Sequence, residues 1–170
     1  MTKKVADIEK SSRHQKIIGE QGEHLVCNWL SRSGFEVAVV DHTGIDVIAY
    51  DPRTEERLGI SVKSRTRNLG KEKDSVNIFS YREGKNDRKK LTDACKAFNA
   101  DPWLAVYVET TDHADLFLTS LSNYDAKYGK TEKRAIDNWK MGAKHLQAYD
   151  EDKQVMHLHL GFEARNWFRK

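Results

Sequence analysis

Apolar residues recur at helical spacing in two stretches of the chain. The first stretch ends near Ser33, just before Gly34, and carries Ile18, Val26 and Leu30 on one stripe. A glycine directly after the last periodic residue is a common helix stop. The second stretch covers residues 86–99 and repeats the same spacing. Both patterns predict amphipathic helices that each lay one face on a hydrophobic core.

Short β-branched runs bounded by turn residues predict strands. Residues 44–50 and 60–65 are two such runs, and the polar linker 51–56 contains a proline, so we expect a hairpin with a slightly long loop. Residues 35–41 are apolar almost throughout, which predicts a strand buried on both faces. Further strands are expected at residues 75–79, 102–108, 114–120 and 155–160. The order α-β-β-β-α-β-β predicts an α/β fold.

Composition narrows the class of protein. The chain has 170 residues, of which 32% are charged and 38% hydrophobic, so we expect one main domain. No apolar run approaches the ~20 residues of a membrane-spanning helix, and the N-terminal residues lack the apolar run of a signal peptide. Cys27 and Cys95 belong to no Cys or His cluster. We therefore expect free thiols in a reducing, cytoplasmic protein that does not bind membranes.

Positive charge is concentrated in residues 60–90. This segment holds ten Lys or Arg residues against four Asp or Glu, whereas the whole chain has a net charge of only +3. A localised basic segment is typical of a surface that binds a polyanion, and an ordinary solvated loop and helix is the alternative. The candidate DNA-binding residues are Arg65, Arg67, Lys71, Lys73, Arg82, Lys85, Arg88 and Lys89.

Candidate chemistry lies on the predicted hairpin. Side chains alternate along a strand, so Ser61 and Lys63 share a face, and Asp46 lies on one face of the preceding strand. If the faces coincide, a carboxylate and an ammonium lie side by side at the edge of the core. An ordinary surface ion pair is the alternative. Glu23, at the edge of the first helix's apolar stripe, is poorly placed to be fully solvated, and Glu20 lies one turn behind it.

The predicted strand 155–160 carries two histidines. His157 and His159 share one of its faces and could form a metal pair. The sequence places no third Cys, His or carboxylate at metal-ligand spacing beside them. This pattern favours two packing histidines over a metal site.

The layout of Asp46, a turn, and then Ser61-Val62-Lys63 resembles the signature of the PD-(D/E)xK nuclease superfamily. Within that superfamily the order of blocks is similar to archaeal Holliday-junction resolvases. The matching blocks are Gly19-Glu-Gln-Gly-Glu23 through Gly34-Phe35-Glu-Val, Ile45-Asp46-Val-Ile-Ala, Lys63, Asp87 through Phe98, and Asp101-Pro102-Trp-Leu-Ala-Val.

The resemblance implies a restriction-endonuclease-like αβββαβ core, with a mixed β-sheet flanked by helices. It covers residues 15–122 as the nuclease-like domain. Residues 1–14 are then a flexible N-terminal segment, and residues 123–170 are a C-terminal extension packed on the core. The implied activity is Mg²⁺-dependent or Mn²⁺-dependent hydrolysis of DNA, including branched DNA, in repair, recombination or a mobile element. The implied oligomer is a homodimer.

The resemblance also implies site roles. Glu23, Asp46 and Lys63 fall on the catalytic positions, and Glu23, Asp46 and the Val62 carbonyl are the implied metal ligands. One position departs from the family: it carries an acid two residues before the lysine, where this chain has Ser61.

Because Mg²⁺ prefers hard oxygen ligands, the loss of one carboxylate weakens the set unless Glu20 replaces it. Two other hypotheses therefore stay open: a catalytically weak or inactive nuclease-fold DNA-binding protein, and a protein-interaction module.

Overall fold

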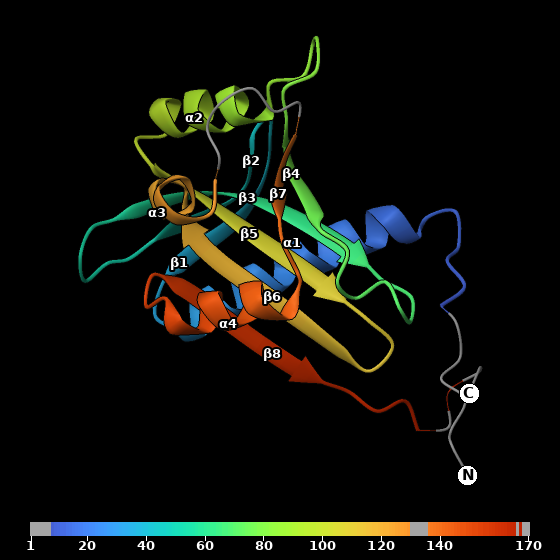
Figure 1. Ribbon diagram of the computed structural model, residues 1–170. Coiled ribbons are helices and arrows are strands. Elements are labelled where there is room, and N and C mark those ends of the chain that lie inside the picture. Colours follow the sequence, from blue (N-terminus) through green and yellow to red (C-terminus); the bar gives the residue numbers. More distant parts are fainter. Residues whose placement is uncertain (1–7, 130–135, 166, 168–170) are drawn as a thin grey trace.

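A six-stranded mixed sheet forms the centre of the structure, a computed structural model that describes residues 8–129, 136–165 and 167 (Figure 1). Its strands run in the order β1-β2-β3-β5-β6-β8. Only β3 and β5 are parallel, and the other neighbours are antiparallel. The bounds are β1 (Glu36–His42), β2 (Ile45–Tyr50), β3 (Arg57–Thr66), β5 (Asp101–Glu109), β6 (His113–Ser120) and β8 (Val155–Gly161).

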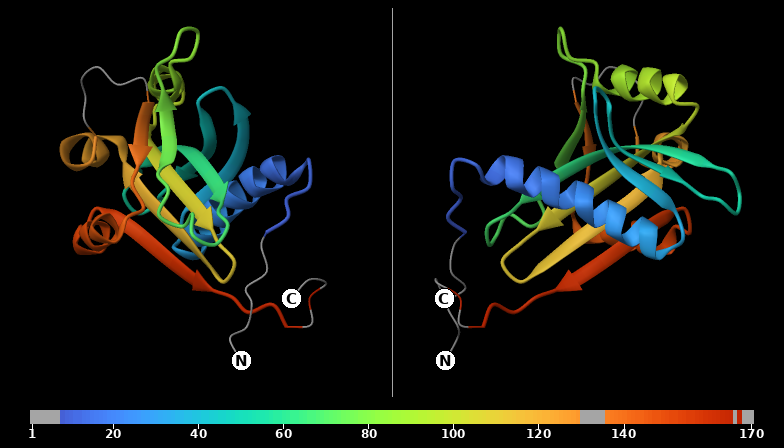
Figure 2. Two further views of the ribbon diagram at one scale, coloured as in Figure 1. Left: turned by 45° about the vertical axis from the view of Figure 1, so that its right-hand side comes forward. Right: turned by 180° about the vertical axis from the view of Figure 1, so that it is seen from behind.

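Helices cover both faces of this sheet. Helix α1 lies behind the sheet in Figure 1 and in front of it in the right-hand view of Figure 2. Within the described residues, the opposite face carries three helices and a two-stranded ribbon of β4 and β7. Their bounds are α1 (His14–Arg32), α2 (Asp87–Ala97), α3 (Leu121–Lys127), α4 (Ala143–Glu151), β4 (Val76–Ser80) and β7 (Ile136–Trp139). The predicted mixed sheet flanked by helices is confirmed.

Strand alternation divides the core into two halves. On β5, Ala105 and Tyr107 pack on the α1 side, whereas Leu104 and Val106 pack on the side of α2 and the β4–β7 ribbon. Residues i and i+2 of a strand share a face, so each strand of the sheet contributes to both halves. The second half is rich in aromatic rings, and Trp139 of β7 stacks on Tyr149 of α4 with ring centroids 4.1 Å apart.

The edge strand β1 differs from the expectation. Its apolar run predicts burial on both faces, but most of its residues are exposed and Val39 is 44% exposed. Strand β1 pairs only with β2 and stands at one end of the sheet. The apolar β-branched run therefore predicted the strand correctly. The prediction that this strand is buried on both faces was wrong, because β1 is an edge strand.

The N-terminal residues reach the end of β3. Half of the segment 1–14 expected to be flexible, residues 1–7, lies outside the described residues. The Lys10 ammonium donates to the Thr66 carbonyl oxygen at 2.7 Å, and His14 Nε2 lies 2.8 Å from Thr66 Oγ1. These contacts tie the start of α1 to the C-terminal end of β3.

The two cysteines and the described helices bear on two further predictions from the sequence. Cys27 and Cys95 are free, as predicted. Burial raises the pKa of the Cys95 thiol to about 11, so it stays protonated and unreactive near neutral pH. Among the described helices, none is long and apolar enough to cross a bilayer.

Helix α1 approaches the sheet closely at Gly22. A methyl group built on Gly22 would lie 2.1 Å from Ser64 Oγ and 3.4 Å from the Tyr107 Cβ. Gly19, one turn earlier, has nothing within 4 Å. Ser64 Oγ is buried and has no hydrogen-bond partner among the described residues. The absence of a side chain at Gly22 thus sets the distance between helix and sheet.

We therefore expect opposite effects from two alanine substitutions in α1. Gly22→Ala should lower the free energy of unfolding by about 1–3 kcal/mol, because the added methyl overpacks the contact with Ser64. Gly19→Ala should raise it by up to about 1 kcal/mol, because alanine is the better helix former. Urea unfolding followed by circular dichroism measures both. Adding Ser64→Ala should recover part of the loss in Gly22→Ala, and equal stability of the two single variants would contradict the close contact.

Candidate active site

The Asp46 side chain lies where β2 separates from β3. Pairing between these strands runs from Tyr50 with Arg57 to Val47 with Ile60 and then stops. Beyond that point the Asp46 Oδ2 atom accepts a hydrogen bond of 2.6 Å from the Val62 backbone N–H. The carboxylate thus takes the place of a backbone partner and is held against the β3 backbone between Ser61 and Lys63.

The alternation of side chains between the two faces of the sheet is also interrupted at Asp46. Ile45 packs in the core half beneath α2, whereas Val47 packs in the half beneath α1. Residues two apart in a regular strand would share a face, so the alternation breaks between them. Asp46 is therefore aimed along the gap between the strands and not perpendicular to the sheet. This geometry leaves its Oδ1 atom for another partner.

Glu23 reaches the same place from α1. Its carboxyl is partly buried, and this burial raises its pKa, with the nearby Asp46 carboxylate as the next largest cause. Glu20 and Asp41 raise the pKa further, and only His24 opposes them. Within the described part of the chain, Glu23 makes no ion pair or hydrogen bond. Two neighbouring carboxylates without a cation between them are the electrostatic signature of a site that a divalent ion would stabilise.

Ser61 and Lys63 lie on the other face of β3. Ile60 and Val62 pack beneath α1, so by alternation the side chains of Ser61 and Lys63 point to the α2 side. Ser61 is 7% exposed and Lys63 is half-buried. No ion pair or hydrogen bond joins Lys63 to Asp46 or Glu23 among the described residues. The structure therefore brings Glu23 and Asp46 near each other, whereas the side chains of Ser61 and Lys63 lie on the other face of β3 and do not form the expected side-by-side pair with Asp46.

Glu20 lies on the exposed side of α1. It forms an ion pair of 3.7 Å with Lys16, and both side chains are more than half exposed. It still contributes to raising the pKa of Glu23. Glu20 is therefore close enough to influence the carboxylate pair electrostatically, while its own carboxylate is solvated and paired.

The basic residues divide into two groups at opposite ends of β4. Lys71 and Lys73 are exposed on the loop between β3 and β4, and Arg82 and Lys85 are exposed on the loop between β4 and α2. Figure 1 shows these two loops at opposite ends of β4. The second loop borders a cleft of about 450 Å³. Its cationic lining residues are Arg82, Lys85, Lys89 and Lys90.

The remaining cationic side chains already have hydrogen-bond or ion-pair partners within the chain. Arg65 is half-buried and donates to the Ser64 carbonyl oxygen at 2.7 Å, and burial lowers its pKa. Arg67 donates to the Ser75 carbonyl oxygen at 3.0 Å. Arg88 forms ion pairs with Asp125 and Asp137, so its charge is already balanced. Lys89, although exposed, forms an ion pair with Asp93 on the next turn of α2.

Comparison with solved structures identifies the architecture. The Holliday junction resolvase Hjc from the archaeal hyperthermophile Archaeoglobus fulgidus superposes with a TM-score of 0.51 at 18% identity. The match covers 76% of this chain and 88% of that protein. The chain therefore shares its restriction-endonuclease-like fold, a mixed sheet flanked by helices, with that protein. A scan of protein-family models and a search of curated proteins find no match for the sequence.

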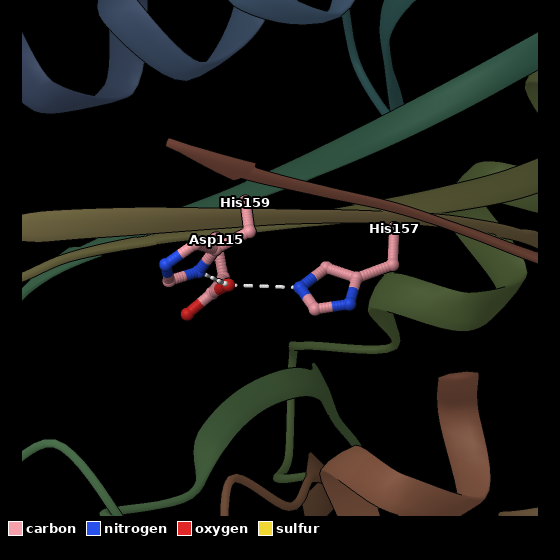
Figure 3. A group of neighbouring side chains, drawn as sticks. All are labelled: Asp115, His157 and His159. Carbon is pink, nitrogen blue, oxygen red and sulfur yellow. Dashed lines mark hydrogen bonds and ion pairs between the residues drawn. The ribbon is translucent and has the colours of Figure 1, made fainter. Parts of the chain in front are cut away.

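One chemically notable cluster lies away from the Asp46 gap. His157 and His159 on β8 meet Asp115 on β6 (Figure 3). No third ligand stands at short spacing from these histidines in the sequence. Asp115 lies more than forty positions away and joins them only through strand pairing. An isolated aspartate within the apolar run 114–118 was the signal that could have found it.

Asp46→Ala tests the strand separation. We expect it to lower the free energy of unfolding by about 1–3 kcal/mol, because the partly buried Val62 N–H loses its acceptor. Asp46→Asn keeps an acceptor oxygen and should stay within about 1 kcal/mol of the natural chain. Asp41→Ala, which removes another acid near Glu23 without touching a backbone N–H, is the matched control and should change stability by less than ~0.5 kcal/mol. Equal stability of Asp46→Ala and Asp46→Asn in urea unfolding would contradict this role.

Proposed function

We propose that this protein is a divalent-metal-dependent DNA endonuclease of the repair, recombination or mobile-element type, with Mg²⁺ or Mn²⁺ as its cofactor. The observation that carries the proposal is the Glu23–Asp46 carboxylate pair at the separation of β2 and β3, in a chain with a resolvase fold. A solved structure with this fold is a Holliday junction resolvase, so we infer a branched DNA substrate for this chain as well.

In this proposal Asp46 and Glu23 hold the metal ion together with the Val62 carbonyl. Carboxylate and carbonyl oxygens are the ligands that Mg²⁺ prefers. When bound, the ion supplies Lewis-acid polarisation of the phosphoryl oxygen and lowers the pKa of the attacking water. The Val62 N–H fixes Asp46 Oδ2 in place, so the carboxylate is oriented before any substrate arrives.

Lys63 acts from the opposite face of β3. Its ammonium makes no ion pair with a described carboxylate, so it is available to orient the attacking water or to balance charge on the phosphate. Ser61, on the same face, provides a hydroxyl where the family carries an acid. The metal set is therefore one carboxylate short, and the solvated Glu20 is the residue of this chain that could compensate.

The exposed cations on the two loops flanking β4 serve the DNA backbone. We assign phosphate contacts to Lys71 and Lys73 on one loop and to Arg82 and Lys85 on the other. Lys89, at the cleft beside the second loop, can exchange Asp93 for a phosphate at little cost, because its present ion pair is exposed. Arg88 holds α2 to α3 and the ribbon in this assignment. A homodimer would present two such sites to the two equivalent strands of a junction.

A second function is favoured by one observation. Ser61 is buried at the position where the family has a metal ligand, and a chain that retains the fold and the basic loops without that ligand could bind DNA and not cleave it. Such a protein would recognise branched DNA as an architectural or regulatory factor. Cleavage and binding assays on the same preparation separate the two functions.

The endonuclease proposal predicts metal-dependent cleavage on a panel of four-way, nicked and linear DNAs. Asp46→Asn and Glu23→Gln should each lower the rate by at least ~100-fold, because charge stabilisation by the metal contributes several kcal/mol. Both should leave DNA binding intact or slightly stronger, since each removes a negative charge near the phosphates.

Ser61→Glu should raise the rate in Mg²⁺ relative to Mn²⁺, provided the variant remains folded by circular dichroism. Natural-chain cleavage that survives both Asp46→Asn and Lys63→Ala would exclude this site. DNA binding without cleavage by either the natural chain or Ser61→Glu would support the second function.

DNA affinity should fall steeply with salt, with a slope of about −0.9 per phosphate contact on duplex DNA. Two double charge reversals test the loops: Lys71→Glu with Lys73→Glu, and Arg82→Glu with Lys85→Glu. Each should reduce the magnitude of that slope by the contribution of up to about two phosphate contacts. Fluorescence anisotropy at several salt concentrations measures this. Lys153→Glu reverses an exposed charge between α4 and β8 and is the matched control. It should leave the slope unchanged and lower the DNA affinity only slightly at every salt concentration. Affinity that does not depend on salt would remove the nucleic-acid function.

A further inference from the structure

Two histidines and an aspartate converge on the face of the sheet opposite α1. Asp115 of β6 pairs in register with His159 of β8, and Phe117 pairs with His157. The three polar side chains therefore lie on one face by alternation. Asp115 Oδ1 lies 2.8 Å from His157 Nε2 and 2.7 Å from His159 Nδ1 (Figure 3). One nitrogen or oxygen atom from each of the three residues lies within 4.8 Å of the others.

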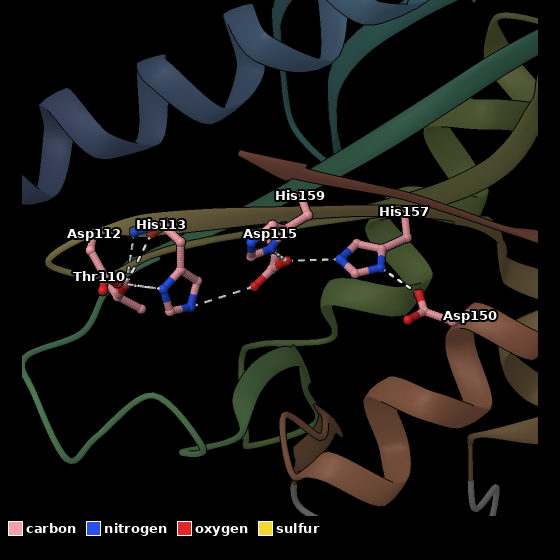
Figure 4. A network of polar contacts seen from close by, with 7 residues as sticks. All are labelled: Thr110, Asp112, His113, Asp115, Asp150, His157 and His159. Atoms are coloured by element: carbon pink, nitrogen blue, oxygen red, sulfur yellow. Dashed lines mark hydrogen bonds and ion pairs between the residues drawn. The ribbon is translucent and has the colours of Figure 1, made fainter. Parts of the chain in front are cut away.

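A third histidine lies beside the same carboxylate. His113 Nε2 is 3.9 Å from Asp115 Oδ2, and its ring centroid lies 5.4 Å from that of His159. Figure 4 shows His113 and His157 on opposite sides of Asp115. Three imidazoles and one carboxylate form the nitrogen-and-oxygen donor set that Zn²⁺ and related divalent transition metals prefer.

The outer nitrogens of two histidines have partners that fix their orientation. His157 Nδ1 lies 2.5 Å from Asp150 Oδ1 of α4, and His113 Nδ1 lies 2.6 Å from Asp112 Oδ1 and 2.9 Å from Thr110 Oγ1 (Figure 4). A metal-ligating histidine commonly donates its second N–H to a carboxylate or another acceptor, which leaves the inner nitrogen free to bind the metal. Both histidines meet this requirement.

We propose that Asp115, His157 and His159 bind a divalent transition metal of the Zn²⁺ class, with His113 as the fourth ligand. The ion takes the place of the protons that now join Asp115 to the two imidazoles. It joins β6 to β8, and through Asp150 it also orders α4, so it stabilises the C-terminal part of the chain. A cavity of about 160 Å³ borders Asp115 and His113 and provides an approach for the ion.

An ion-pair network is the alternative, because Asp150 and Asp112 place a further carboxylate beside His157 and His113. His159 still shares Asp115 with His157, and two charged imidazoles on one carboxylate would repel each other. Here three imidazoles surround Asp115, whose side chain is only 10% exposed, and Phe117 stacks on His157 with ring centroids 4.3 Å apart. Packing and outer hydrogen bonds hold these rings in place, as a preorganised site requires.

This site is distinct from the carboxylate pair at Asp46. Strand pairing aligns Lys63, Val106, Phe117 and His157 across four neighbouring strands. Three inter-strand spacings separate Lys63 from His157, which corresponds to ~14 Å between their backbones. The two sites also differ in chemistry, because the Asp46 site offers only oxygen ligands and the Asp115 site offers imidazoles. Zn²⁺ should therefore prefer the Asp115 site and Mg²⁺ the Asp46 site.

The test is a titration of the full chain, prepared without a polyhistidine tag and stripped with a chelator, with Zn²⁺ and in parallel with Co²⁺. We expect one tight equivalent of Zn²⁺ by calorimetry, a visible Co²⁺ absorption typical of a four-coordinate site, and a higher melting temperature with Zn²⁺. His159→Gln should weaken Zn²⁺ binding at least ~10-fold and keep the fold, because this side chain is 61% exposed. His157→Ala combined with His159→Gln should abolish the tight equivalent.

Two controls locate the binding. His145→Ala removes a histidine of α4 that lies outside the cluster, and it should leave Zn²⁺ affinity unchanged. Asp46→Asn should also leave it unchanged, which separates this site from the proposed catalytic one. The proposal is overturned if the natural chain binds no Zn²⁺ equivalent, if a folded His159→Gln variant binds Zn²⁺ as tightly as the natural chain, or if Asp46→Asn removes the binding.

Discussion

The hydrogen bond from the Val62 N–H to Asp46 is the contact on which the candidate active site depends. At this position β2 separates from β3, and without Asp46 the partly buried Val62 N–H would have no hydrogen-bond acceptor. A side-chain carboxylate satisfies the donor and is itself held against the β3 backbone. The same contact therefore permits the strands to separate and places an anion in the gap. Ser61 and Lys63 flank Val62 in the sequence, so by alternation their side chains lie on the other face of β3.

Helix α1 adds the second carboxylate at an electrostatic cost. Partial burial and the Asp46 charge both disfavour the ionised form of Glu23. The buried stripe of Ile18, Val26 and Leu30 holds the helix on the sheet and so keeps it from moving away to relieve this repulsion. A fold selected only for stability would place a cation here or a neutral side chain. An unrelieved pair of acids in a rigid setting is instead what a metal-binding site requires before the metal arrives.

The same sheet supports a second polar cluster because β8 joins it at the edge. Strand β8 comes from the C-terminal part of the chain and brings His157 and His159 to Asp115. Helix α4, which packs next to β8, supplies Asp150 to the outer side of His157. The two clusters offer different donor atoms on one scaffold: carboxylate oxygens between diverging strands, and imidazole nitrogens beside Asp115 on a regularly paired face.

Local periodicity by itself determined the helices, the hairpin and the fold class, because the 3.6-residue and two-residue patterns report which side of each element is buried. The order of blocks around Glu23, Asp46 and Lys63 determined the resemblance to resolvases. The tertiary structure decided what depends on neighbours: that β1 is an exposed edge strand, that Asp46 points along the strand gap, and that Arg88 is neutralised by Asp125 and Asp137. It also decided that Asp115 meets two histidines more than forty positions later. Strand pairing brings these residues together over long sequence separations, and no periodicity within a single strand records its partner.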